Sequence, residues 1–208
     1  MALVGIALSA GCGSPYYTAD PIEARVVDAD TGHAIEGAIV TANWQLLAGS
    51  LEGPGRKLRQ LEVMETTTDS NGRFRFPGFT RINVSLDRLG EEDPQILIFK
   101  PGYEYLRTSN RYDAIDAPGP HRASSTNGMT LRMQKASADV KERAWNLGFL
   151  GRNLDVMEHA GMLNRIPRML KATHCEKAFL KLVDRTVLIS IPGKDEQEAE
   201  CAQTKTDR

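Results

Sequence analysis

The side chains that could carry chemistry in this chain are few, and they lie far apart in the sequence. Cys175 directly follows His174, and a thiol beside an imidazole can act as a nucleophile. The other three histidines, His33, His121 and His159, lie in unrelated segments, and no Cys/His spacing suits zinc. The chain contains no G-x-S-x-G, H-E-x-x-H or Walker pattern. We therefore expect no catalytic residue, no metal and no cofactor.

Two acidic segments have the spacing that begins a calcium-binding loop. The first is Asp28-Ala29-Asp30-Thr31-Gly32, and the second begins at Asp69. Such a loop needs a bidentate carboxylate at its twelfth position, and here that position holds Ile39 or Thr80. We interpret both segments as tight turns between strands, for which Asp, Asn and Gly are the favoured residues.

Composition narrows the class of protein. The 208 residues are enough for one domain, or for one domain with an appendage. With 26 Lys and Arg against 27 Asp and Glu, the net charge is −1, so no overall positive field would attract nucleic acid. No apolar stretch is long enough for a polytopic membrane protein. The composition is that of a globular domain with a packed core.

The amino terminus has the pattern of an export signal. Residues Ala2–Gly11 carry no charge and are mostly apolar, and a run of about ten such residues is too short to cross a bilayer. Small residues stand directly before Cys12, which resembles the lipobox of bacterial lipoproteins. The resemblance implies that residues 1–11 are removed and that Cys12 becomes the lipidated, palmitate-bearing first residue. A short buried strand or a disordered end is the alternative.

Cysteine usage agrees with export. If Cys12 is acylated, only Cys175 and Cys201 remain. An even remainder in an oxidising compartment predicts a disulfide between them, and closing this loop would stabilise the fold by roughly 3–4 kcal/mol. Two unrelated free thiols are the alternative.

The first two thirds of the chain predict a β-sandwich. After a linker at residues 12–21, short strands alternate with turn signals from residue 22 to about 135. Alternating apolar residues along Val40–Leu46 place Trp44 in the core, and Phe74 follows by the same argument. Ile96–Phe99 is apolar on both faces, which is typical of a central strand.

After the last predicted strand, the periodicity changes from strand to helix. Residues 136–150 and 155–182 are rich in helix formers with apolar residues at helical spacing. Pro167 must kink the second stretch or begin a new helix. We expect Trp145 to anchor this helical extension, residues 136–193, to the sandwich.

The carboxyl-terminal end is expected to become extended again. Thr186–Ile191 could form one more strand, and Lys194–Arg208 has the composition of a solvated polar tail. Because this tail has few apolar residues, the predicted bond from Cys201 would be its main attachment.

Two turn motifs resemble the carboxypeptidase regulatory-like domains. Between Glu23 and Val40 the chain has a strand, then D-x-x-T-G, then G-A-x-V; between Thr67 and Phe76 it has the hairpin T-D-x-x-G-x-F. The resemblance implies a seven-stranded, transthyretin-like (prealbumin-like) sandwich over residues 22–135. The fold class is then mainly β with a C-terminal helical extension. In this family the domain is a non-catalytic companion, so no catalytic residue is carried over.

Surface domains related to this family can form Lys–Asn isopeptide bonds beside a buried carboxylate. In this chain Lys100 with Asn43 or Asn83 is the pair to inspect, although nothing in the sequence positions them together.

Tyrosines mark one candidate binding surface. Residues 107–127 form a polar connection long enough to predict either a functional loop or disorder. Tyr112 lies within it, and Tyr103 and Tyr105 come just before it. Tyrosine rings can stack on sugars or anchor a protein partner. The alternative is a flexible flap with core tyrosines.

Basic residues mark a second candidate surface on the predicted helices. Their spacing of three or four residues would place them in one stripe that could meet anionic headgroups or glycan phosphates. The residues are Arg165, Arg168, Lys171, His174, Lys177 and Lys181. A solvated helix face is the alternative.

These patterns favour a non-enzymatic lipoprotein of the cell envelope with a structural or protein-interaction role. Its expected partners are a membrane, through the N-terminal lipid, and an envelope protein or glycan. It would face the periplasm, with the outer membrane as the expected location. A carbohydrate-binding module of the starch-binding-like type is the second hypothesis, because related sandwich folds bind such glycans. An enzyme such as a hydrolase is the third.

Overall fold

The computed structural model describes residues 14–47, 58–85, 87–90, 92, 94–110, 119–193 and 201. It is mainly β, with a pair of helices at the C-terminal end, as the sequence predicts. The strands are β1 (Tyr16–Ala19), β2 (Ile22–Asp28), β3 (Ile39–Leu47), β4 (Leu58–Thr67), β5 (Arg73–Phe76), β6 (Phe79–Ile82), β7 (Arg88–Leu89), β8 (Gln95–Phe99), β9 (Leu106–Thr108), β10 (His121–Arg122) and β11 (Thr130–Met133). The helices are α1 (Val140–His159), the short 3₁₀ turn η3 (Leu163–Arg165) and α2 (Pro167–Val183).

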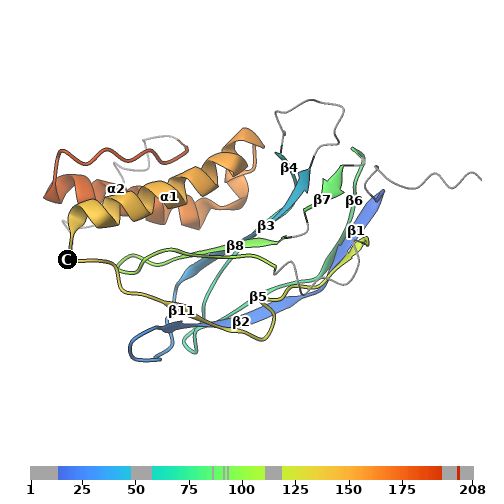
Figure 1. Ribbon diagram of the computed structural model, residues 1–208, viewed down its shortest axis with the longest axis horizontal. Coiled ribbons are helices and arrows are strands. Elements are labelled where there is room, and N and C mark those ends of the chain that lie inside the picture. The colour runs from blue at the N-terminus through green and yellow to red at the C-terminus, as the bar shows by residue number, and fades with distance from the viewer. Residues whose placement is uncertain are drawn as a thin grey trace, which may run out of the picture.

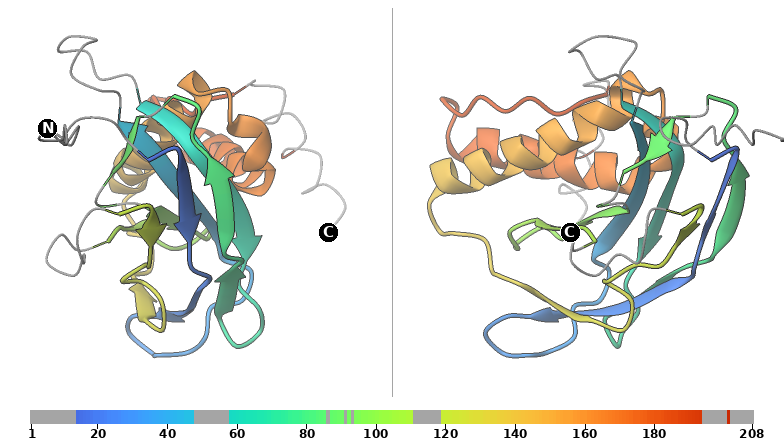
Figure 2. Two further views of the ribbon diagram at one scale, coloured as in Figure 1. Left: turned by 90° about the vertical axis from the view of Figure 1, so that its right-hand side faces the viewer. Right: turned by 45° about the vertical axis from the view of Figure 1, so that its right-hand side comes forward.

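The elements stack in three layers (Figure 1). The first layer contains two small sheets, β10–β1–β6 and β11–β2–β5, and the second is the sheet β4–β3–β8–β9, with β7 paired to the end of β3. Helices α1 and α2 cover the outer face of the second layer, as the turned views in Figure 2 also show. One apolar core therefore fills the sandwich, and a second one lies between the sandwich and the helices.

The side chains of strand β8 contribute to both apolar cores. Its side chains alternate: Ile96 and Ile98 belong to the sandwich core, whereas Leu97 and Phe99 pack in the core beneath the helices. All four side chains are buried, and β8 lies between β3 and β9. The apolar run at this position therefore forms the central strand that the sequence predicts.

The aromatic residues assigned to the core lie inside the sandwich. Trp44 is 1% exposed, and its ring meets Phe79 edge to face with the ring centroids 4.8 Å apart. Phe74 and Phe76 are also buried, and their centroids are 5.7 Å apart. The alternation seen in the sequence therefore identified these core positions correctly.

The described part of the chain contains eleven strands, more than the seven that the resemblance implies. Two long strands of the first layer are each bent into two by proline: Pro21 separates β1 from β2, and Pro77 separates β5 from β6. The bent strands remain neighbours, because β1 pairs with β6 as β2 pairs with β5. Residues 16–19, expected within a linker, are thus the first strand of the sandwich.

The two helices lie in the region that the sequence predicts to be helical. Helix α1 begins at Val140 rather than at residue 136 and continues through the predicted break near residue 150, and α2 ends at Val183. The Asp139 carboxylate caps the start of α1 by accepting from the Lys141 N–H at 2.8 Å. Gly161, with φ +69°, ends the turn after α1, and Pro167 begins α2 as a new helix.

A glutamate from the sheet supplies the missing cap of α2. The residue before this helix, Ile166, provides no side-chain hydrogen bond. Instead, Glu65 on β4 accepts from the backbone N–H groups of Arg168 at 3.1 Å and Met169 at 2.8 Å. A buried carboxylate at a helix N-terminus satisfies two N–H groups that would otherwise lack partners. The sheet and α2 are therefore joined by polar as well as apolar contacts.

The strand predicted at Thr186–Ile191 does not form. These residues belong to an extended segment, residues 184–193, which we call the strap. Its apolar residues Val187, Ile189 and Ile191 are buried in the core beneath the helices, and Leu188 is 95% exposed. Exposed and buried side chains do alternate along the strap, but the helices rather than a neighbouring strand cover its apolar side.

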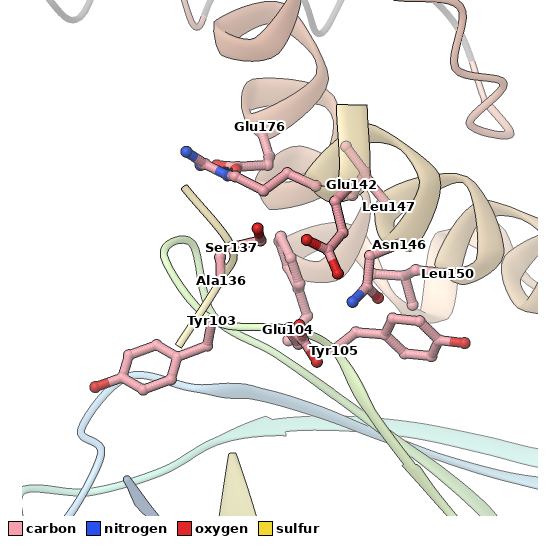
Figure 3. A pocket seen from close by; sticks show the side chains of 12 residues that line it. Tyr103, Glu104, Tyr105, Ala136, Ser137, Glu142, Asn146, Leu147, Leu150 and Glu176 are labelled. Carbon is pink, nitrogen blue, oxygen red and sulfur yellow. Dashed lines mark hydrogen bonds and ion pairs between the residues drawn. The ribbon is translucent and has the colours of Figure 1, made fainter. Parts of the chain in front are cut away.

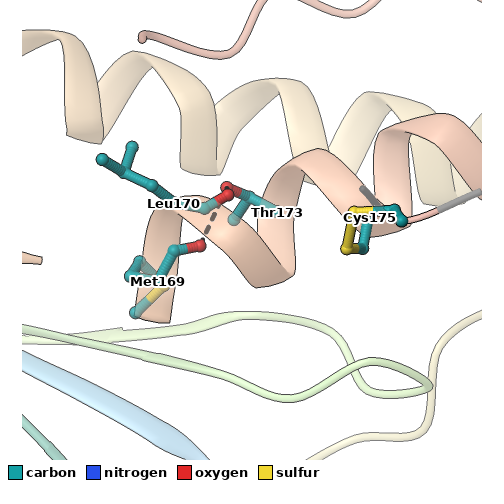
Figure 4. The surroundings of a disulfide bond; sticks show 5 residues. Met169, Leu170, Thr173 and Cys175 are labelled. Atoms are coloured by element: carbon teal, nitrogen blue, oxygen red, sulfur yellow. Dashed lines mark hydrogen bonds between the residues drawn. A yellow bond between two sulfur atoms is a disulfide. The ribbon is translucent and has the colours of Figure 1, made fainter. Parts of the chain in front are cut away.

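The predicted disulfide is present. Cys175 on α2 is bonded to Cys201, with their Cα atoms 5.2 Å apart (Figure 4). The loop that it closes contains the strap, which is also held at its end, where His174 Nε2 donates to the Pro192 carbonyl at 3.1 Å. The disulfide closes a loop that begins on α2, and none of the strands β1 to β11 lies within that loop.

The register of the second sheet separates Lys100 from both asparagines. Asn43 on β3 pairs with Gln95, at the other end of β8 from Lys100. The Lys100 amine donates to the Glu36 carbonyl at 2.9 Å, while the Asn83 amide donates to the carbonyls of Ser14 and Asp87. These positions give no support to an isopeptide bond.

Candidate binding surfaces

A pocket lies where the turn between β8 and β9 meets the helical layer (Figure 3). The turn supplies Glu104 and Tyr105, and α1 supplies Glu142 and Asn146, four residues apart on one face of the helix. Ser137 closes one side, in the segment that leads from β11 to α1. The pocket therefore forms only because the C-terminal helices pack on the sandwich.

The lining of this pocket is acidic. Three of its side chains are carboxylates, those of Glu104, Glu142 and Glu176, and Arg143 is its one cation. Arg143 bonds to Glu176, and its guanidinium also lies 5.3 Å from the centroid of the Phe179 ring. Arg143 is thereby held against α2, and the Glu142 carboxylate projects from α1 toward Glu104 (Figure 3). Hydroxyl or cationic groups of a ligand would suit this lining.

Tyr103 and Tyr105 border the pocket but form no common platform. Their rings point in opposite directions in Figure 3, and both are only partly exposed. The Tyr103 hydroxyl donates to Asp28 at 3.1 Å, while Tyr105 packs against the core beneath the helices. Tyr112, the third tyrosine of this predicted surface, lies outside the described residues. Both described tyrosines thus have structural roles.

The connection at residues 107–127 is built into the fold on both sides of its undescribed part. Asn110 accepts from the Ser125 N–H at 2.8 Å and donates to the Ala123 carbonyl at 2.9 Å. Arg122 is buried, and β10 pairs in parallel with β1. The described parts of this connection are therefore not a flap.

Asp28 is used within its own turn, as the sequence predicts. One of its oxygens accepts from the Thr31 N–H at 2.8 Å, the Asp30 N–H at 3.0 Å and the Thr31 hydroxyl at 3.0 Å. These bonds, that of the Thr31 N–H above all, together with the Tyr103 hydroxyl, lower the pKa of Asp28 from 3.8 to about 2 despite its burial. Burial and the bond to Asp28 raise the pKa of Tyr103.

This lowered pKa predicts an acid-dependent contribution to stability. Because the unfolded chain titrates Asp28 at a higher pH, the contribution is complete above about pH 4 and is lost as the pH falls toward about 2. In urea denaturation, Asp28→Asn should therefore lower the free energy of unfolding at about pH 6, and the difference from the parent should shrink toward about pH 2. A difference that does not change with pH would contradict the assignment.

The predicted basic stripe is interrupted. Arg165, Arg168 and Lys171 are exposed, but Lys177 is only 6% exposed and Lys181 is partly buried. Six residues of helix make about one and two-thirds turns, so Lys177 lies well around the helix from Lys171, on the side that faces the core. His174, also assigned to the stripe, is fully buried. The described cations thus form a shorter patch at the start of α2.

The exposed face of α1 carries an aromatic surface that the sequence interpretation missed. Trp145, expected to anchor the helix to the sandwich, is instead 67% exposed. It meets Phe149 edge to face at 5.0 Å, and the Arg152 guanidinium lies 4.1 Å from the Phe149 centroid and 5.9 Å from that of Trp145. We call these three residues the α1 aromatic surface.

Helical spacing could have revealed this surface. The buried residues Leu147, Leu150 and Leu154 define one side of α1, and Trp145 and Phe149 fall on the opposite side. The prediction that Trp145 anchors the helix rests on residue type alone, whereas its phase relative to the leucines places it on the exposed side of α1.

Cys12 and the rest of residues 1–13 lie outside the described residues, as do residues 194–200 and 202–208 of the predicted tail. Among the described helices, none has the length and hydropathy needed to cross a membrane. In the described part of the chain, no three His, Cys, Asp or Glu residues are grouped so that they could hold a metal ion.

Comparison with known proteins gives no family for this chain. No family model matches it, and no curated protein matches it. The resemblance to carboxypeptidase regulatory-like domains therefore stays a prediction, although both turns on which it rests are present.

Solved structures resemble the chain weakly. A 3-chlorocatechol 1,2-dioxygenase from Rhodococcus opacus 1CP is 18% identical with a TM-score of 0.33, over 58% of this chain and 61% of that one. A streptococcal ancillary pilin is 16% identical with a TM-score of 0.28, over 56% and 29%. The pilus 2b backbone protein of group B streptococcus is 15% identical with a TM-score of 0.30, over 57% and 42%. The chain spans less than two thirds of each.

Proposed function

We propose that this protein is a non-enzymatic, lipid-anchored protein of the cell envelope that binds another envelope protein through the α1 aromatic surface. The observation that carries the proposal is the exposure of Trp145, Phe149 and Arg152 on one helix face. Tryptophan and arginine are the residue types most enriched among side chains that dominate protein–protein binding energy. The two rings and the guanidinium already contact one another, so little side-chain entropy would be lost on binding.

The anchoring part of the proposal rests on the residues before Cys12 and has its own test. With the chain expressed behind a complete export signal, Cys12→Ser should move the protein from the membrane to the soluble periplasmic fraction. The parent should incorporate a fatty-acid probe, and the variant should not. Membrane association of the parent without incorporation of the probe would contradict lipid anchoring.

The binding part is tested by photo-crosslinking in cells. A photoreactive amino acid at position 149 should give one discrete adduct with another protein, and Trp145→Ala should remove most of it. Met129, which is 46% exposed on the sandwich, provides the matched control position and should give no such adduct. Absence of an adduct at position 149, or an adduct with twice the mass of this chain, would contradict the proposed partner.

The pocket supports carbohydrate binding as a second candidate function. The carboxylates of Glu104 and Glu142 and the amide of Asn146 can bond to sugar hydroxyl groups, although the two tyrosines do not form a stacking platform. Retention of the protein on insoluble polysaccharides, with loss of retention in Glu142→Gln, would favour this function over the first. The first function predicts no retention.

A further inference from the structure

The end of the molecule where residue 14 lies carries an exposed apolar cluster. Tyr16 is 49% exposed, Ile82 is 79% exposed and Val84 is 91% exposed. Tyr16 and Ile82 are directly paired between β1 and β6, and Val84 follows in the next turn. We call these three residues the N-terminal tip. They contribute to neither core of the protein.

Hydrogen bonds hold the tip firmly in this arrangement. Asn83, between the two exposed aliphatic residues, is buried and donates through its side chain to the carbonyls of Ser14 and Asp87, both at 2.8 Å. Its backbone N–H donates to the Pro15 carbonyl at 2.8 Å. The burial of Asn83 turns its neighbours Ile82 and Val84 outward, so their exposure follows from the structure of the turn.

Chain length places the tip close to the predicted anchor. Only Gly13 separates Cys12 from Ser14, and an extended chain spans at most about 3.6 Å per residue. The Cα atom of Cys12 is therefore within about 7 Å of that of Ser14, and within about 14 Å of that of Tyr16. The interfacial layer on each side of a bilayer is itself about 5–7 Å thick. If Cys12 is acylated, the chain between Cys12 and Tyr16 is too short for the tip to lie far from the lipid.

The chemistry of the tip suits that position. Tyrosine is enriched at membrane interfaces, where its ring lies among the headgroups, and aliphatic side chains gain free energy on leaving water. Of the neighbouring cations, Arg81 on β6 pairs with the Glu62 carboxylate, and Arg88 on β7 is exposed. Acidic Asp87 is largely buried and pairs with Arg59 at 3.2 Å.

We propose that the N-terminal tip rests in the headgroup layer of the membrane that holds Cys12, with Tyr16, Ile82 and Val84 in contact with lipid. The inference depends on the lipid anchor of the proposed function and adds an orientation to it. The start of β1 and the end of β6 lie at the other end of the molecule from the start of α1 (Figures 1 and 2). The membrane therefore meets the tip, and the start of α1 lies at the end of the molecule away from the membrane.

The test uses the lipidated full chain in vesicles of phosphatidylethanolamine and phosphatidylglycerol. Because Cys12 would be acylated and Cys175 is bonded to Cys201, Val84→Cys would supply the single reactive thiol for a spin label. Leu188→Cys, at a position that is 95% exposed on the strap, is the matched control. The label at position 84 should be several-fold less accessible to a water-soluble relaxation agent, and more accessible to oxygen, than the label at position 188.

The outcomes separate the two proposals. If mass spectrometry shows a lipidated Cys12 while both labels are equally accessible to the water-soluble agent, the tip inference is wrong and the anchor stands. If Cys12 carries no lipid, the anchor and the tip inference both fail. A lipidated chain in which only the label at position 84 is protected supports both.

Discussion

Replacing Trp44 with alanine is expected to lower the free energy of unfolding by about 3–5 kcal/mol. The side chain is almost completely enclosed, and it packs against Phe79 at the centre of the sandwich. Removing it leaves a cavity that the rigid strands around it can fill only in part, so both apolar contacts and packing are lost. Urea denaturation followed by far-ultraviolet circular dichroism measures the change.

Two variants make this expectation specific. Trp44→Phe should cost less than about 1.5 kcal/mol, because it keeps an aromatic ring and the Trp44 Nε1 has no hydrogen-bond partner within the described structure. Trp145→Ala should change stability by less than about 0.5 kcal/mol, since that ring is exposed. A loss below about 1 kcal/mol for Trp44→Ala would contradict the burial of its ring in the core.

Gly151→Ala should loosen the strap, with a net loss of about 1–3 kcal/mol. A Cβ atom at residue 151 would lie 2.3 Å from the backbone oxygen of Ser190 and 3.1 Å from the end of the Ile191 side chain. The contact is with backbone, which cannot rotate away, so the strap must move. Movement would expose Val187 and Ile189, which the strap now buries against the helices.

A second glycine on the same helix provides the control. Gly148 is three residues from Gly151, but a Cβ atom there would meet nothing within 4 Å. Gly148→Ala should therefore raise stability by up to about 1 kcal/mol through helix propensity alone. Hydrogen exchange should increase at residues 187–191 in Gly151→Ala and not in Gly148→Ala. Destabilisation by both variants would show that the helix, rather than the strap contact, is responsible.

The basic stripe and the pocket show which surface features could not be predicted from the sequence. Helical spacing suggested a basic stripe from Arg165 to Lys181, but η3 and Pro167 interrupt the helix, and α2 turns Lys177 toward the core. The pocket at Glu104 and Glu142 could not be predicted, because these residues lie far apart in the sequence and meet only when the helices pack. Contacts between the helices and the sheet depend on how these elements pack against each other, which local sequence patterns do not encode.

The sequence by itself determined the local features, because each depends on residues close together in the chain. Alternating apolar residues identified the core positions of β3 and β5, the apolar run identified β8 as central, and Asp28 to Gly32 specified a turn. Only the tertiary structure decided that helices α1 and α2 cover the outer face of the second sheet, that β1 is part of the sandwich, and that Lys177 faces the core. Those properties depend on which distant surface covers each apolar face, and this is settled by packing across the whole chain.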